Sequence, residues 1–83
     1  VNEKLHILKE EIAKRNLDPE KVCFVGNDIT DVDCIKYASL GIAVNDAYPE
    51  VKKFAKIVTK KKGGEGAIRE VADMILNHNF DKI

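Results

Sequence analysis

Two carboxylates and an amide follow a short apolar run within six residues of one another. The run Val22–Val25 ends at Gly26, and Asn27, Asp28 and Asp31 come directly after it. A short apolar run bounded by glycine is typical of a buried strand, and open α/β sheets bind ligands where such strands end. Side chains that offer only oxygen suit a hard cation such as Mg²⁺. Because Asp and Asn also form turns and cap helices, the pattern alone predicts either a magnesium-dependent phosphoryl site or a capped turn.

Two further features of the sequence could contact an anion. Lys4 begins the first predicted helix, where a lysine is usually just solvated. The loop 60–66 starts with three lysines and continues with Gly63 and Gly64. Backbone N–H groups of such a loop could cradle an anion in front of a helix. No Gly-Lys-Ser/Thr follows, which excludes a Walker loop, and a plain loop remains the alternative.

The apolar periodicity predicts an α/β domain that would place these residues. Helices are expected at 3–15, 31–38, 48–55 and 67–76, and short strands at 21–25, 42–44 and 57–59. Strands alternating with helices predict a three-layer parallel sheet, covered on both faces. Three strands are few for such a sheet, so we expect residues outside this chain, or other copies of it, to complete the sheet. The helices should bury a set of apolar residues: Val32, Ile35, Ala38, Val51, Phe54, Ile68, Val71, Ala72, Ile75 and Leu76.

Two local patterns predict how the helices begin. Thr30 and Asp33 have the spacing of a capping box, and Asn45 with Asp46 could cap the helix that follows the second strand.

The composition is that of one small domain, residues 1–83. Fourteen basic and fourteen acidic residues give no net charge, which argues against nucleic-acid or membrane-surface binding driven by bulk electrostatics. No apolar run approaches the roughly 20 residues of a membrane span. Cys23 and Cys34 fit no metal spacing, and we expect both to be buried thiols in a reducing, cytoplasmic environment. The chain begins with Val1 rather than Met, which predicts a fragment or a processed chain.

Several segments together resemble the haloacid dehalogenase superfamily of phosphatases. Residues 26–31 look like its fourth motif, and Lys4 matches the lysine of its third motif. Residues 42–49 and 63–70 are similar to one branch, the cap-less, tetrameric 3-deoxy-manno-octulosonate 8-phosphate phosphatases. That branch includes the phosphatase-like C-terminal domain of some acylneuraminate cytidylyltransferases. The resemblance extends over about residues 3–77, with the motifs in the right order.

The resemblance implies a Rossmann-like core and a Mg²⁺-dependent phosphatase. In this family a carboxylate attacks phosphorus, and water then hydrolyses the aspartyl phosphate. Lys4 would orient the phosphoryl group, and Arg69 would face the substrate. The magnesium ligands would be Asp28, Asp31 and Asn27, the last as a weaker, neutral ligand. The implied substrate is a phosphorylated sugar acid, and the implied assembly is a homotetramer.

The sequence departs from the family in one decisive respect. No Asp-x-Asp follows an apolar strand before Lys4, and Asp31-Val32-Asp33 lies at a helix start. We therefore interpret the chain as the C-terminal half of the domain, inactive by itself because the nucleophile is missing. The alternative is a non-catalytic oligomerisation domain of an acylneuraminate cytidylyltransferase. A phospho-acceptor receiver domain is less favoured, because its lysine follows the acceptor acid, whereas Lys4 precedes Asp28.

Overall fold

The computed structural model describes residues 3–77, which form four α-helices, three β-strands and two short 3₁₀ turns. In chain order these are α1 (Glu3–Lys14), η1 (Pro19–Lys21), β1 (Cys23–Gly26), η2 (Ile29–Asp31), α2 (Val32–Tyr37), β2 (Leu40–Ala43), α3 (Pro49–Phe54), β3 (Ile57–Val58) and α4 (Ala67–Leu76). Every predicted helix and strand is present, with ends that differ from the prediction by at most two residues. The sequence therefore predicted the elements correctly.

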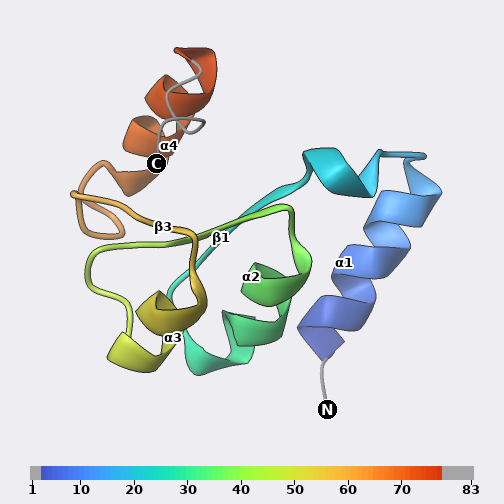
Figure 1. Ribbon diagram of the computed structural model, residues 1–83, viewed down its shortest axis with the longest axis horizontal. Helices are drawn as coiled ribbons and strands as arrows, with labels where there is room; N and C mark the ends of the chain where they lie inside the picture. Colours follow the sequence, from blue (N-terminus) through green and yellow to red (C-terminus); the bar gives the residue numbers. More distant parts are fainter. Residues whose placement is uncertain (1–2, 78–83) are drawn as a thin grey trace.

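The strands form one parallel sheet in the order β1-β2-β3. Val25, Ile42 and Ile57 lie side by side across the three strands. As Figure 1 shows, α2 and α3 lie on one side of the sheet, α4 lies on the other, and α1 stands beside α2. The predicted three-layer α/β fold is confirmed. β1 and β3 are the outer strands, so the sheet is open at both edges within the described residues.

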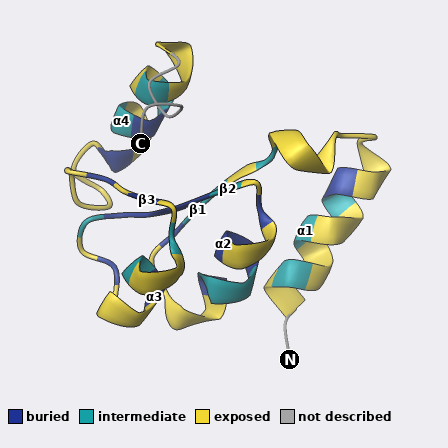
Figure 2. Ribbon diagram, viewed as in Figure 1, coloured by how far each residue is buried: buried dark blue, intermediate teal, exposed yellow. Residues whose placement is uncertain are grey.

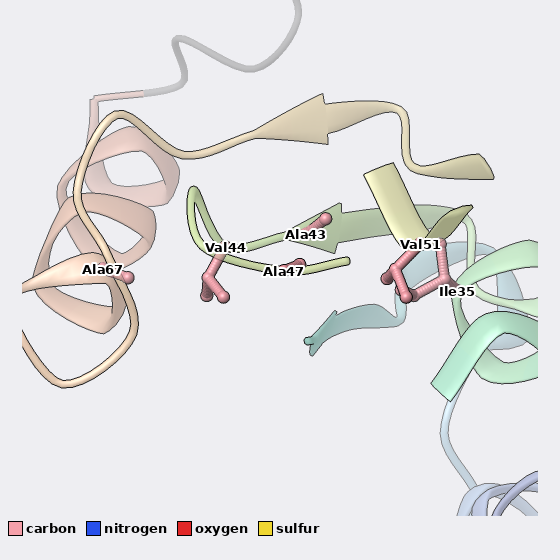
Figure 3. Close-up of a cluster of buried hydrophobic side chains, with 6 residues drawn as sticks. All are labelled: Ile35, Ala43, Val44, Ala47, Val51 and Ala67. Atoms are coloured by element: carbon pink, nitrogen blue, oxygen red, sulfur yellow. The ribbon is translucent and has the colours of Figure 1, made fainter. Parts of the chain in front are cut away.

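The core divides between the two faces of the sheet, as alternation of side chains along a strand requires. On the α2–α3 face, Ile35 and Val51 pack against Ala43, and Figure 3 shows this cluster. On the α4 face, Val71 packs with Ile42 and Ile57. Burial of these side chains, about 1.5–3 kcal/mol for each large one, holds the layers together.

Gly41 in β2 determines how closely α2 approaches the sheet. A Cβ at this position would collide with the main-chain carbonyl of Ile35, which has little freedom to move. The missing side chain therefore lets the end of α2 rest directly on the strand.

The prediction that both cysteines are buried was wrong for one of them. Cys34 in α2 is fully buried, whereas Cys23 in β1 is exposed. β1 is an edge strand, and α4 covers the sheet mainly over Ile42 and Ile57, so the amino end of β1 is left open. A hollow of about 250 Å³ lies there, lined in part by Cys23, Leu40 and Ile75.

Several other residues predicted to be buried are exposed, as Figure 2 shows for the outer sides of the helices. Phe54 at the end of α3 has the Nζ atoms of Lys36 and Lys53 at 5.0 and 6.0 Å from its ring centroid. On α4, Ala72 is only half-buried, and three further residues are exposed: Ile68, Ile75 and Leu76. The face of α4 that meets the sheet is narrow, because β3 has only two residues to pack against it.

Candidate metal and anion site

The loops that follow the three strands meet at the carboxyl edge of the sheet. The backbone N–H of Tyr48, after β2, donates to the carbonyl oxygen of Asn27, after β1, at 3.4 Å. The N–H of Asn45 donates to the hydroxyl of Thr59, after β3, at 3.0 Å. The polar residues predicted from the sequence to lie at strand ends therefore do lie there, on loops that are tied to one another.

Asp31 is buried at the end of β1, where Gly26 leaves room for it. A Cβ on Gly26 would lie 2.6 Å from the Cβ of Asp31 and 2.9 Å from its Oδ2. Oδ2 accepts hydrogen bonds from the backbone N–H groups of Asn27 and Asp28, each at 3.0 Å. The absence of a side chain at Gly26 thus lets the Asp31 carboxylate lie beneath the turn, where its hydrogen bonds stabilise the turn.

The other oxygen of Asp31 binds Lys4. Lys4 Nζ donates to Asp31 Oδ1 at 2.7 Å and to the hydroxyl oxygen of Thr30 at 2.9 Å. The contact joins the first turn of α1 to η2, 27 residues later in the chain. The lysine side chain is half-exposed and the carboxylate is buried.

The two charges shift each other's titration. The hydrogen bond to Asp31 raises the pKa of Lys4, and the nearby Asp28 carboxylate contributes to the same increase. Burial alone would raise the pKa of Asp31, but hydrogen bonds from Lys4 and from the backbone outweigh it, so the net pKa is lowered. The pair is therefore ionised at neutral pH.

Asp28 and Asn27 differ from Asp31 because their side chains are exposed. Asp28 Oδ1 accepts a hydrogen bond from the N–H of Ile29 at 2.7 Å, and Asp28 and Asp31 form the capping box of η2. The predicted box of Thr30 and Asp33 was therefore wrong, because the turn begins two residues earlier. Asn45 and Asp46 do not cap α3 either, which starts at Pro49 without a side-chain cap.

The donor set fits Mg²⁺ only in part. The exposed Asp28 carboxylate and Asn27 amide offer the hard oxygens that Mg²⁺ prefers, and Mg²⁺ is commonly held by one or two carboxylates, waters and substrate phosphate. Both oxygens of Asp31 already accept hydrogen bonds. Within residues 3–77, no group of three or more His, Cys, Asp or Glu side chains is placed to hold a metal ion. Among the described residues, Asp28 and Asn27 could therefore supply only part of a coordination shell.

The loop between β3 and α4 is held by side chains that the sequence analysis did not single out. The buried Thr59 hydroxyl donates to the carbonyl oxygen of Lys61 at 2.6 Å. The Glu70 carboxylate of α4 accepts hydrogen bonds from the N–H groups of Lys60 and Lys61, at 2.8 to 2.9 Å. These contacts link residues that are up to ten positions apart in the chain. The one sequence signal for them is an acidic residue, Glu70, in the first turn of α4.

The predicted substrate residues have different partners in the structure. Gly63 lies beside the loop after β2, where its N–H donates to Asp46 Oδ1 at 2.9 Å, and Gly64 has a φ of 82°. Arg69 is exposed, and its Nε lies 3.3 Å from Asp73 Oδ1; Glu65 and Glu70, the partners that its charge suggests if it faces no substrate, do not pair with it among the described contacts. Arg69 borders a hollow of about 770 Å³ between α4 and the preceding loop. Figure 1 shows α4 well apart from α1, which carries Lys4.

Comparison with known proteins places the chain in a family. Residues 2–75 match the haloacid dehalogenase-like hydrolases, and the chain belongs to that family. Within it, the chain falls in the branch of the 3-deoxy-D-manno-octulosonate 8-phosphate phosphatases. It is 40% identical to the Yersinia pestis enzyme over 75 residues and 38% identical to the Escherichia coli enzyme over 73 residues. The resemblance inferred from the sequence motifs is confirmed.

Solved structures show the same fold. The phosphatase from Moraxella catarrhalis, solved in complex with a magnesium ion, a phosphate ion and a 3-deoxy-D-manno-octulosonate molecule, superposes with a TM-score of 0.88 at 30% identity. The match covers 99% of this chain and 48% of that one. A probable phosphatase from Pseudomonas syringae superposes at 0.87, with 36% identity, over 93% of this chain and 44% of that one. The chain spans about 40% of the length of the curated relatives that it matches. No helix among the described residues is long and apolar enough to cross a membrane.

Proposed function

We propose that this chain is the lysine- and metal-bearing half of a phosphatase that hydrolyses phosphorylated sugar acids. Residues 1–83 would form the C-terminal half of the domain in a longer protein. One observation carries the proposal: Lys4 Nζ is fixed by Asp31 and Thr30 beside the exposed carboxylate of Asp28. An ammonium has three N–H donors, so one remains for an anion at the same place.

Each residue of the site would have a distinct role. Asp28, assisted by Asn27, would hold Mg²⁺, because its carboxylate is exposed at the carboxyl edge of the sheet. Bound Mg²⁺ would offset the charge of the phosphate, so that an anionic nucleophile can approach. Lys4 would bind a phosphoryl oxygen and orient the group. Asp31, which the sequence suggested as a third ligand, would instead hold Lys4 in position and keep it charged.

The attacking carboxylate would have to come from residues outside this chain. Asp31 is engaged by Lys4 and two backbone N–H groups, and Asp33 lies in α2 after the turn. The similarity to sugar-acid phosphatases supports a substrate of that class. The homotetrameric assembly, which follows from the same family branch, and the cytoplasmic location, which follows from the two cysteines, stay predictions.

Two measurements test the proposal. In an NMR titration with Mg²⁺, we expect backbone shifts at Asn27 and Asp28 that Asp28→Asn largely abolishes. Asp33→Asn is the matched control, because it removes an acid of the same segment that lies outside the site. Shifts that survive Asp28→Asn and disappear with Asp33→Asn would contradict the assignment.

The second measurement is turnover. The 83-residue chain should release no phosphate from p-nitrophenyl phosphate or 3-deoxy-D-manno-octulosonate 8-phosphate in the presence of Mg²⁺. A longer protein that contains the chain should hydrolyse the sugar-acid phosphate, and Lys4→Met should remove that activity. Turnover by the short chain that persists after repurification would refute the half-site proposal.

A further inference from the structure

Lys4 has a second partner, Thr30, to which the roles proposed above assign no separate function. The Thr30 hydroxyl oxygen accepts from Lys4 Nζ at 2.9 Å, in addition to the 2.7 Å bond to Asp31. Thr30 lies in η2 directly before Asp31, so both acceptors belong to one rigid turn. The turn itself is fixed to the backbone of Asn27 and Asp28.

The second hydrogen bond limits how the Lys4 ammonium group can turn. A single hydrogen bond lets the ammonium group turn about the N–H···O axis, so that Cε and the other two N–H groups sweep a cone. Two fixed acceptors, Asp31 and Thr30, remove this freedom and leave the third N–H with one direction. An acceptor in that direction meets a donor that needs no further ordering, which strengthens binding by preorganisation.

We propose that Thr30 is a positioning residue, which sets the direction of the free N–H of Lys4 toward a bound phosphate. The inference rests on the proposed function, because it takes Lys4 as the group that binds the phosphoryl oxygens. Asp31 supplies the charged acceptor that anchors the ammonium group, and Thr30 supplies the orientation.

The test uses the complete chain with ¹³C,¹⁵N-labelled lysine and inorganic phosphate as the probe. NMR reports two separate quantities for Lys4: the rate at which its Nζ hydrogens exchange with water, and the dissociation constant for phosphate. We expect Thr30→Val to speed the exchange and to weaken phosphate binding about five-fold, the value of one ordinary hydrogen bond. Thr30→Ser should restore both within about two-fold, because it returns the hydroxyl.

A control variant separates this effect from loss of any hydroxyl. Ser39→Ala removes a hydroxyl that donates to the carbonyl oxygen of Val22 at 2.8 Å, at the amino end of the strands. It should leave both Lys4 quantities unchanged. Far-UV circular dichroism and urea unfolding check that each variant is folded.

The outcomes distinguish the inference from the function on which it rests. If wild-type Lys4 responds to phosphate but Thr30→Val changes neither quantity, or if Thr30→Val changes the exchange alone, the positioning role is refuted and the proposed function stands. If phosphate fails to shift the wild-type Lys4 signals, the anion-binding role of Lys4 fails, and the role of Thr30 fails with it. A weakened affinity that Thr30→Ser does not rescue also overturns the proposal.

Discussion

Replacing Asp31 with Asn tests how the carboxylate at the end of β1 stabilises the fold. Asn has nearly the same shape, and its amide oxygen can still accept from the N–H groups of Asn27 and Asp28. Its NH₂ group, however, would point at the Lys4 ammonium, where the structure has a 2.7 Å ion pair. The substitution therefore removes the charge and leaves the packing unchanged.

The magnitude follows from the three hydrogen bonds that Asp31 accepts. A hydrogen bond to a charged group contributes about 1.5–3 kcal/mol and a neutral one about 1 kcal/mol, so each of the two backbone bonds loses roughly 1 kcal/mol. The Lys4 side chain is half-exposed, and solvent screens an ion pair of that kind, so it contributes less than the two backbone bonds together. We expect Asp31→Asn to lower the free energy of unfolding by about 2–3 kcal/mol, and Lys4→Met to lower it by clearly less.

Urea unfolding followed by circular dichroism measures both variants and the double variant. With a slope near 1 kcal/mol per molar for a chain of this size, the midpoint for Asp31→Asn should fall by about 2–3 M. The double-mutant cycle should give a coupling between Lys4 and Asp31 that is smaller than the effect of Asp31→Asn alone. If Lys4→Met costs as much as Asp31→Asn, the ion pair rather than the backbone bonds stabilises the turn, and the reasoning is wrong.

Three further predictions concern the same region and the two cysteines. Gly26→Ala should destabilise the chain by about 1–3 kcal/mol and speed exchange of the Lys4 Nζ hydrogens, because the new methyl group meets Asp31; an unchanged urea midpoint would contradict this. Iodoacetamide should alkylate Cys23 in the native chain and spare Cys34; burial raises the pKa of both thiols, but only Cys34 is closed to the reagent, so equal labelling in a mass spectrum would contradict this difference in exposure. The folded pKa of Asp31 is below its ordinary value of 3.8, so its stabilisation is present above that pH and is lost as the pH falls through the folded pKa. The folded pKa of Lys4 is raised, so its stabilisation is present below its ordinary pKa of 10.5 and is lost as the pH rises through the folded pKa. Asp31→Asn should reduce the loss of stability at acid pH, measured by urea unfolding between pH 2 and 6.

The elements were predictable because their signals are local. The apolar spacing of α4 gave both of its ends correctly, and short apolar runs located the strands. Which of the apolar side chains are buried was harder to predict, because a sequence pattern identifies apolar side chains but not the elements that cover them. Cys23 sits in an apolar run yet is exposed, since within residues 3–77 the amino end of this edge strand borders an open hollow. Leu76 continues the apolar periodicity of α4 but is exposed, because it lies beyond the part of the sheet that could bury it.

The site was predictable by residue type but not by role. The acids and the lysine were found from their positions at a strand end and a helix start. Asp28 is exposed, whereas Asp31 is buried against Lys4. The different roles of the two acids depend on this contact, which joins residues 27 positions apart in the chain. Nothing local distinguishes the two acids. Thr30 was assigned to a helix cap for the same reason, because its contact with Lys4 is also non-local.

The open edge of β1 has a consequence for the solubility and assembly of the chain. Among the described residues β1 pairs only with β2, so Cys23–Gly26 present a second row of backbone donors and acceptors. Such an edge is a template for strand addition, whether by a specific partner or by aggregation. A parallel strand that joins there would bring its own carboxyl end next to Asn27 and Asp28. If the proposed function is right, the strand that covers this edge would also bring residues that complete the site. A chain whose edge is covered in any other way would stay soluble but would lack those residues.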